Sequence, residues 1–488
     1  MKSQILLLSA VLMSSAAMAQ NEQIHLFRND KAFNSYKASD IESISFTDNG
    51  GSFVGMLITD KDSKGTTVNI SAIDSVVMSS TGLPEIHVNL IDYPDWTDLL
   101  KDQTHTKETE YSATLYMEGN GMYDDLPLQN VTFRGRGNST WNLPKTPYRF
   151  KMSSKTSVCG MKKAKSFVLI ANYIDCTLMR NAIALWVSQR LGMPFANHSV
   201  PVKMYFNNIY KGAYMLTEKI GIGSGSVDID ENTGILFELD SNYDEDFKYQ
   251  FSWTSGSEEK YLPVMVKDPD FTEIAPELGT TATEYWDMWQ TDFTKFANAV
   301  VSRPASQSLS DVLDMESAVN FFMVNGLCNN HEMQHPKSLF IHKDSINGIY
   351  KFGPVWDFDG AFTYDGSSYN GEQGSPTTVL VAQDCAAGGY SFLKCLFANA
   401  EFRTLFKARL EKFAEEDYPQ LKNYMEEYAT LIEPSAKENG LLWDDDTSIP
   451  EFKSVSSWEF RNNFNTLKSW LDTRVKYMLD HKNFGLYE

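Results

Sequence analysis

The sequence predicts an α+β protein in which a small all-β module precedes a larger domain. Three observations support this fold class. Residues 20–82 contain short runs of alternating apolar and polar residues, and strand-like runs continue to about residue 240. From about residue 283 onward, apolar residues recur at helical spacing and leave charged faces, which predicts helices over Tyr285–Ser302, Met315–Leu327, Phe397–Glu415, Leu421–Ile432 and Ser457–His481. Strands and helices are therefore segregated along the chain, as in α+β proteins.

The first nineteen residues have the pattern of a secretory signal peptide. Lys2 precedes an apolar run that starts at Ile5, and Ala17–Ala19 has the small-residue spacing of a cleavage site. The apolar run is too short to span a bilayer, and no cysteine follows the site to accept lipid. We expect an exported protein, secreted or held in the periplasm or at the cell surface, without a transmembrane segment after cleavage.

Composition excludes some classes of partner. The chain has 488 residues, which is room for two or three domains, and 43 basic residues against 64 acidic ones give a net charge of −21. Such a surface argues against nucleic acid or anionic lipid as the partner. The five cysteines are odd in number and lack C-x-x-C spacing, so they indicate neither a zinc knuckle nor a dense disulfide framework.

Residues 20–82 form the predicted all-β module. The segment Ser39–Ile44 returns in similar form as Ser71–Val76, and both copies lead into β-type runs. The module carries no visible chemistry, so a spacer or docking role is the default. A linker of small residues precedes Pro84, and we place the main domain at 83–488.

The first candidate site in the main domain is a glycine-containing turn that follows strand-like runs. Small residues there let backbone amides approach a ligand, and arginines supply positive charge suited to phosphate. The next segment, Pro144–Lys151, alternates so that its basic residues fall on one face of a strand. Two interpretations stay open, a nucleotide cradle and a tight hairpin with a solvated basic edge. The polar residues of the turn are Arg134, Arg136, Asn138 and Ser139.

The middle of the chain predicts one helix and two strands. Apolar spacing indicates an amphipathic helix over Asn181–Gly192, and strands over Val202–Phe206 and Ile235–Leu239. Glu238 and Asp240 make the last strand more polar than a core strand requires. They either line a cleft or pair within the structure.

The stretch Asn329–Phe362 contains most of the candidate chemistry. Polar residues follow an apolar helical pattern, a β-hairpin is predicted to turn at Asn347-Gly348, and carboxylates follow at Asp357 and Asp359. Protein kinases use the same order, in which a catalytic loop is followed by two short strands and an acidic loop that holds magnesium.

A competing motif lies in the same stretch, because residues 331–335 read H-E-x-x-H. On a helix, this spacing places His331 and His335 on one face as zinc ligands, with Glu332 as the general base of a metallopeptidase. Pro336 disfavours helical geometry at the second histidine, and the asparagines upstream indicate a helix end. The zinc metallopeptidase stays a minor alternative.

Four separated motifs occur in order along the chain. They are RGRGNSTWNLPKTPYRFK (134–151), FVLIANYIDCTLMRN (167–181), YKGAYMLTEKI (210–220) and VWDFD (355–359). Together they resemble the spore coat protein H (CotH) kinase family, from about Ile86 to the C-terminus. The resemblance implies an atypical protein-kinase-like fold that binds ATP with Mg²⁺ or Mn²⁺ and transfers phosphate to Ser or Thr of secreted or cell-surface proteins.

The resemblance also implies roles for individual residues. Lys145 and Lys151 are the candidates for the lysine that contacts the nucleotide, beside the turn that starts at Arg134. Glu218 matches an acidic position that would orient a lysine. Asp357 matches the metal-binding aspartate, and Asp359 would add a second ligand.

The sequence departs from the family in the predicted catalytic group, Glu332 and Lys337. Many relatives have N-x-D where this chain has Asn330-His331-Glu332. A glutamate accepts a proton, but its extra methylene displaces the carboxylate, and a misplacement of about 1 Å costs roughly a hundredfold in rate. A catalytically weak or inactive kinase-like domain for surface binding or adhesion is therefore the alternative function.

Overall fold

The computed structural model of the chain describes eleven segments, and the predicted signal peptide lies outside them. Within these segments, no helix has both the length and the apolar character needed to cross a membrane. The α+β prediction is confirmed, since strands dominate up to residue 268 and helices dominate after it. The described residues are 23–28, 33–50, 52–61, 63–79, 82–99, 106–302, 308–334, 336–362, 374–377, 389–443 and 459–480.

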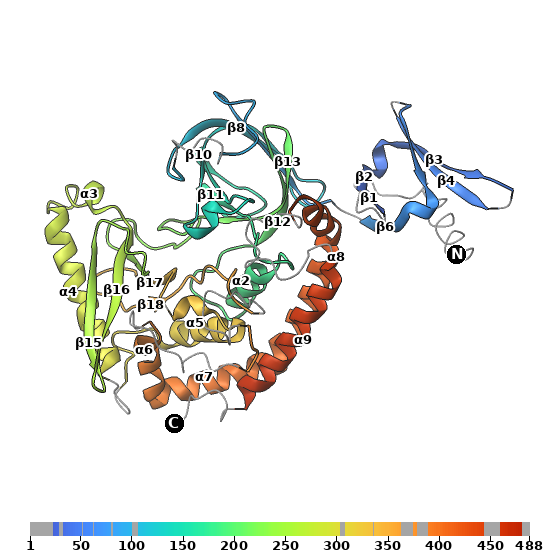
Figure 1. Ribbon diagram of the computed structural model, residues 1–488. Coiled ribbons are helices and arrows are strands. Elements are labelled where there is room, and N and C mark those ends of the chain that lie inside the picture. Colours follow the sequence, from blue (N-terminus) through green and yellow to red (C-terminus); the bar gives the residue numbers. More distant parts are fainter. Residues whose placement is uncertain are drawn as a thin grey trace.

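The N-terminal strands form two small sheets with their own core (blue in Figure 1). Their strand orders are β2-β1-β6 and β3-β4-β5. Each copy of the sequence repeat forms a short 3₁₀ helix, Ala38–Asp40 or Ile70–Ala72, that leads into a strand. The core consists of Leu26, Met56, Ile58 and Val68. The strands are β1 (Gln23–Arg28), β2 (Phe33–Lys37), β3 (Ile41–Asp48), β4 (Phe53–Asp60), β5 (Gly65–Asn69) and β6 (Ile73–Ser79).

Seven further strands close into a barrel, in the order β10-β11-β13-β12-β7-β8-β9. Alternate residues fill its interior, where Phe133, Tyr148 and Phe206 pack on one another. The residues that alternate with the interior ones along each strand face outward. The strands are β7 (Glu85–Leu90), β8 (Tyr111–Glu118), β9 (Leu126–Gly135), β10 (Tyr148–Thr156), β11 (Ala164–Ile170), β12 (Val200–Phe206) and β13 (Ile209–Glu218).

The remaining strands form another sheet of the main domain, in the order β15-β16-β14-β17-β18, which we call the second sheet. The predicted hairpin is confirmed, because β17 and β18 are antiparallel and the turn between them contains Asn347-Gly348. The long β15–β16 hairpin was not predicted, although Phe251 and Trp253 alternate there with polar residues. The strands are β14 (Ile235–Leu239), β15 (Lys248–Ser255), β16 (Glu258–Asp268), β17 (Leu339–Lys343) and β18 (Lys351–Phe352).

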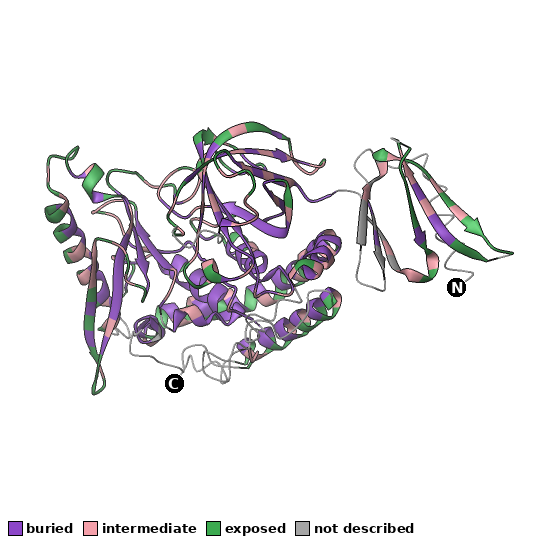
Figure 2. Ribbon diagram, turned by 45° about the horizontal axis from the view of Figure 1, so that its top comes forward, coloured by how far each residue is buried: buried purple, intermediate pink, exposed green. Residues whose placement is uncertain are grey.

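Helices surround this sheet and fill the centre of the molecule. Helix α5 is buried almost throughout and lies between the sheet and the C-terminal helices (Figures 1 and 2). Helix α4 begins with a capping box of Thr281 and Glu284. The helices are α2 (Arg180–Arg190), α3 (Phe271–Ile274), α4 (Ala282–Val301), α5 (Met315–Cys328), α6 (Gly389–Lys394), α7 (Ala400–Lys412), α8 (Tyr418–Trp443) and α9 (Phe460–Leu479).

Helix α8 is longer than predicted. The sequence predicted its end at Ile432, before Pro434, but the helix continues to Trp443. Its last turns pack on the barrel, where the buried Glu438 forms an ion pair of 2.8 Å with Lys203 of β12. Asn439 accepts a hydrogen bond of 2.7 Å from the buried Lys145. Tertiary contacts at the barrel therefore outweigh the local cost of the proline.

Candidate functional site

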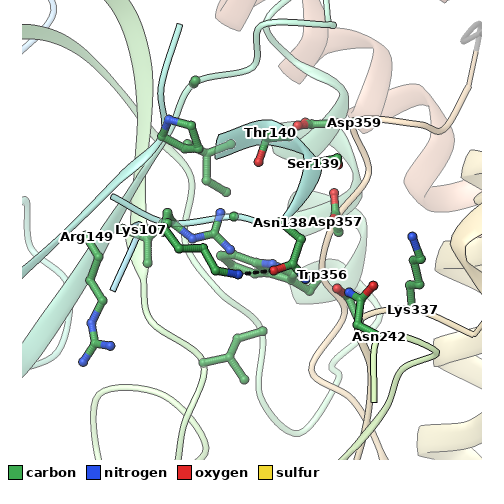
Figure 3. A pocket seen from close by; sticks show the side chains of 18 of the residues that line it. Lys107, Asn138, Ser139, Thr140, Arg149, Asn242, Lys337, Trp356, Asp357 and Asp359 are labelled. Carbon is green, nitrogen blue, oxygen red and sulfur yellow. Dashed lines mark hydrogen bonds between the residues drawn. The ribbon is translucent and has the colours of Figure 1, made fainter. Parts of the chain in front are cut away.

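A cavity of about 530 Å³ is lined by residues from both the barrel and the second sheet. The turn after β9 and strands β10 and β11 form one wall. The segments that follow β14, precede β17 and follow β18 contribute the opposite wall. Its volume lies in the range of small-molecule sites. Figure 3 shows side chains from both walls.

Glu332 lines this cavity because helix α5 stops just before it. Asn329 ends the helix in the left-handed conformation, with φ of +50°. The side chain of Asn330 then caps a short 3₁₀ helix, His331–Met333, by accepting the N–H of Glu332 at 3.2 Å. The N–H of Lys337 donates to the carbonyl of Glu332 at 2.9 Å, so the two predicted catalytic residues are joined through the backbone.

The acidic loop with Asp357 and Asp359 is held by the first residues of helix α2. The side-chain oxygen of Asn181 accepts the N–H of Phe358 at 3.0 Å, and its amide donates to the Asp359 carboxylate. Arg180 donates to the Asp359 carbonyl at 2.7 Å. Sequence reasoning missed both α2 residues as site residues, although they end the second motif of the family resemblance.

The three carboxyl groups at this end of the cavity all have raised pKa values. Withdrawal from water raises the pKa of Glu332 to about 8, and the charge of Asp357 adds to the effect. The same cause, with the neighbouring Asp357, raises the pKa of Asp359 to about 7. Withdrawal from water also raises the pKa of Asp357, against the opposing charges of Arg136 and Lys337. A bound cation would let these groups ionise together.

The donor set fits a hard divalent cation in part. Carboxylate oxygens such as those of Asp357 and Asp359 are the ligands that Mg²⁺ prefers. Among the residues that the structure describes, however, no group of three or more His, Cys, Asp or Glu is arranged to hold a metal. Mg²⁺ commonly binds through one or two carboxylates together with substrate phosphates. The residues therefore fit a cation that a phosphate ligand helps to coordinate.

The glycine-containing turn lies across the cavity from the acidic loop. Arg136 is partly buried, with its guanidinium 5.5 Å from the centre of the Trp356 ring. Asn138 accepts a hydrogen bond from Lys107, and Ser139 begins a short 3₁₀ helix (Figure 3). Arg134, Arg136, Asn138 and Ser139 all line the cavity. The structure therefore brings the predicted turn residues together with the predicted acidic residues.

The sequence of this chain was also compared with known protein families. The family model described as CotH kinase protein matches residues 133–478. The chain belongs to the CotH kinase family. The match begins in β9 and ends in α9, so it contains Arg134 to Asp359 and excludes the N-terminal sheets. A search of curated proteins found no match.

In this CotH-family chain, Lys145 lies at the cavity wall but its ammonium group is already bonded. It is fully buried and donates to the carbonyl of Ala171 at 2.7 Å, to the carbonyl of Ala213, and to Asn439 at 2.7 Å. Three acceptors match the three protons of an ammonium group. The bonds give Lys145 a structural role, and its contact with a nucleotide stays a prediction.

The predicted basic face over Pro144–Lys151 is wrong for Lys145, whereas Arg149 and Lys151 do share the outward face of strand β10. Strand β10 begins only at Tyr148, so Lys145 precedes the strand and its side chain does not follow the alternation. Lys151 is exposed and does not line the cavity. Of the basic residues on that face, Arg149 reaches the cavity.

Glu218 also lies away from the cavity of this CotH-family chain. Its carboxylate bonds the Nδ1 of His198 at 2.5 Å and accepts the His198 N–H at 2.8 Å. The next residue, Lys219, lines the cavity instead. Glu238 both lines the cavity and forms an ion pair of 2.7 Å with Lys267. The two predicted alternatives for this residue, lining a cleft and pairing within the structure, therefore both apply. Sequence reasoning missed Lys219 and Lys267.

The H-E-x-x-H motif does not have the geometry of a zinc peptidase. Helix α5 ends at Cys328, and His331 lies in a 3₁₀ helix of three residues. A zinc site of this class needs both histidines on one α-helix. His335 itself lies outside the described residues.

We expect the purified protein to contain far less than one zinc ion per chain, because His331 does not lie on a helix that presents two imidazoles on one face. His335→Ala should leave ATP binding and any transfer activity largely intact. Elemental analysis checks the first expectation. One tightly held zinc ion per chain, lost together with His335, would contradict it.

Proposed function

We propose that this protein is an exported atypical protein kinase that transfers the γ-phosphate of ATP to Ser or Thr of secreted or cell-surface proteins. One observation supports this most. A single cavity brings Glu332, Asp357 and Asp359 opposite a turn that contributes Arg136 and Ser139. Acidic metal ligands opposite a cationic, amide-rich turn are the combination that phosphoryl transfer requires.

The overall arrangement is consistent with a kinase-like fold. The barrel takes the place of the nucleotide-covering lobe, and the helices around α5 take the place of the lobe that carries the catalytic loop. Val168 and Ile170 of β11 give the cavity an apolar wall that suits a planar base. The loop–hairpin–loop order from Asn330 to Asp359 supplies the remaining parts.

The residues divide the task between them. Asp357 and Asp359 would hold Mg²⁺ or Mn²⁺, which neutralises charge on the triphosphate. Arg136 and the turn that contains Ser139 orient the phosphates. Glu332 accepts the proton of the attacking hydroxyl, and Lys337 beside it offsets the negative charge that develops there.

Export of the protein supports the proposed class of acceptor, but it restricts where the kinase can find ATP. The apolar run and cleavage pattern of residues 1–19 support secretion, and with it an acceptor that is itself secreted or on the surface. ATP is scarce outside the cytoplasm. The kinase therefore acts where a supply of nucleotide accompanies its acceptor.

A second candidate function is a kinase-like domain that binds without catalysis. The pKa of Glu332, raised to about 8, favours this candidate, because a carboxyl group that is protonated at neutral pH accepts no proton. Incubation of the mature protein with labelled ATP and Mg²⁺ or Mn²⁺, followed by mapping of phosphorylated sites, separates the two. Labelled Ser or Thr supports the kinase, and binding without label supports the silent domain.

We expect tight binding of ATP to require a divalent cation. Without the cation, Asp357 and Asp359 repel the triphosphate, so chelation by EDTA should weaken binding by at least about tenfold. In Asp357→Asn, the ATP affinities measured with the cation and in EDTA should differ much less. Calorimetry with and without Mg²⁺ measures both affinities.

Asp244→Asn is the matched control, because Asp244 also lines the cavity but is exposed. Its affinity for ATP with Mg²⁺ should equal that of the wild type. Tight binding of ATP in EDTA that survives in Asp357→Asn would remove the metal role from these residues.

A further inference from the structure

Three cations stand together on the outer wall of the barrel, where it faces the cavity. Arg134 of β9 and Arg149 of β10 are directly opposite each other in the strand register. Lys219 follows the last residue of β13, two strands further along the barrel. All three line the cavity, because their neighbours Phe133 and Tyr148 fill the barrel interior instead. We call these three residues the cation row.

Acidic groups lie near the cation row without pairing closely with it in the part of the chain that the structure describes, since the charge of Glu110 acts on Arg149 and that of Asp268 on Lys219. None of its members forms an ion pair there, and the Nε of Arg134 is buried without a hydrogen-bond partner. Arg149 makes one long hydrogen bond of 3.4 Å, to Ser166. By contrast, Lys267 close by pairs with Glu238 and Glu245, at 2.7 and 2.9 Å.

This arrangement is unfavourable for the empty protein. Like charges directly opposite on neighbouring strands destabilise a sheet. Withdrawal from water and the charge of Arg149 together lower the pKa of Lys219 to about 8, against the opposing charge of Asp268. The Asp268 carboxylate is itself engaged by the N–H of Ile222 at 2.7 Å. An anion held between the three cations would remove the repulsion.

The cation row and the acidic residues occupy different ends of the cavity. In Figure 3, Arg149 lies on the far side of Asn138 and Trp356 from Lys337, and Asp357 lies on the same side as Lys337. The charges that act on Asp357 are those of Arg136 and Lys337, not those of the cation row. An anion on the cation row is therefore separate from a cation held by the aspartates.

We propose that Arg134, Arg149 and Lys219 form a metal-independent phosphate-binding subsite. Two guanidinium groups present paired N–H donors that match phosphate oxygens, and an ammonium group adds a point charge. Phosphate fits better than a single carboxylate, because it carries enough oxygens for all three side chains. The subsite is part of the cavity of the proposed kinase, but it requires neither a metal nor transfer of phosphate.

Two sources can supply this phosphate. One is the nucleotide itself, with part of its phosphate chain on the cation row. The other is a phosphate group already present on the acceptor. Both have the same chemistry at the subsite, and competition between ligands separates them.

Inorganic pyrophosphate in EDTA is the probe, with binding measured by calorimetry. Arg149→Gln and Lys219→Gln should each weaken its binding at least about tenfold, since each removes a charge-assisted contact. Lys151→Gln is the matched control, because Lys151 is two residues from Arg149 on the same strand but exposed and outside the cavity. Its affinity should stay within about twofold of the wild type.

Thermal unfolding provides a second readout. Because each substitution removes repulsion, Arg149→Gln and Lys219→Gln should melt at the wild-type temperature or above it. Wild-type affinity for pyrophosphate in both variants would overturn the subsite. So would an equal loss of affinity in Lys151→Gln, since this would show attraction by overall charge alone.

A competition experiment then identifies the source. If ATP with Mg²⁺ displaces pyrophosphate, the subsite takes a phosphate of the nucleotide. If both bind at once, it takes a phosphate of the acceptor. Failure of the proposed kinase reaction would appear as absence of labelled protein, with metal-free binding of pyrophosphate unchanged.

Discussion

Glu332→Gln should lower phosphoryl transfer by at least about a hundredfold, because the substitution keeps the size of the side chain but removes its ability to accept a proton. ATP affinity should stay within about twofold, since a proton acceptor matters for turnover more than for ground-state binding. Glu332→Asp tests the geometry separately. The shorter side chain that many relatives carry should raise the rate if the extra methylene misplaces the carboxylate.

Glu108→Gln is the control for this experiment, because it makes the same change at an exposed carboxylate on the cavity rim. Its transfer rate should match that of the wild type. If the wild type is silent and Glu332→Asp transfers phosphate, a single methylene inactivates the protein. Wild-type rates in both the Gln and the Asp variants would show that Glu332 is not the base.

Lys145→Met should lower the free energy of unfolding by about 3 kcal/mol or more. The substitution removes the ammonium donor from two buried carbonyls and leaves the Asn439 side-chain oxygen with only the N–H of Ala213, at 3.3 Å. Each unsatisfied buried group costs about 1–3 kcal/mol. Denaturation by urea measures the change. Lys151→Met is the control at an exposed site of the same segment, and it should change stability by less than about 0.5 kcal/mol.

The same variant separates the two roles of Lys145. If this lysine holds the structure together, the folded variant binds ATP with nearly wild-type affinity once temperature and denaturant keep it folded. If the lysine contacts phosphate, the pattern reverses, with affinity lost and stability unchanged. The second result would restore the role that the sequence resemblance implied.

Local periodicity predicted most of the regular elements. Helices α4 and α5 begin and end within a few residues of the predicted limits, because their apolar residues recur at helical spacing on a long run. Helix α8 was predicted too short because Pro434 is a local stop signal, and the contacts that overrule it lie on the barrel. A single sequence does not reveal contacts of this kind.

In the candidate site too, local patterns predicted some features, and contacts between distant residues decided the others. Asp357, Asp359 and Glu332 are close in sequence and follow the order of a known motif, so their joint position was predicted. One hydrogen-bond acceptor of Lys145, Asn439, is 294 residues away along the chain, and no local pattern points to it. Strand β10 begins four residues later than alternation suggested, so Lys145 precedes the strand and only Arg149 and Lys151 follow its alternation. Small errors in strand limits change which side chains share a face.

The docking of helix α8 on the barrel also constrains the order in which the chain matures. The buried pair of Lys203 and Glu438 and the bond between Lys145 and Asn439 join residues of the first half to the last eighth of the chain. Until residue 439 has been synthesised, a nascent barrel therefore lacks the Glu438 carboxylate that pairs with Lys203 and the third acceptor of Lys145. Any truncation that removes the end of α8 should yield a barrel that aggregates.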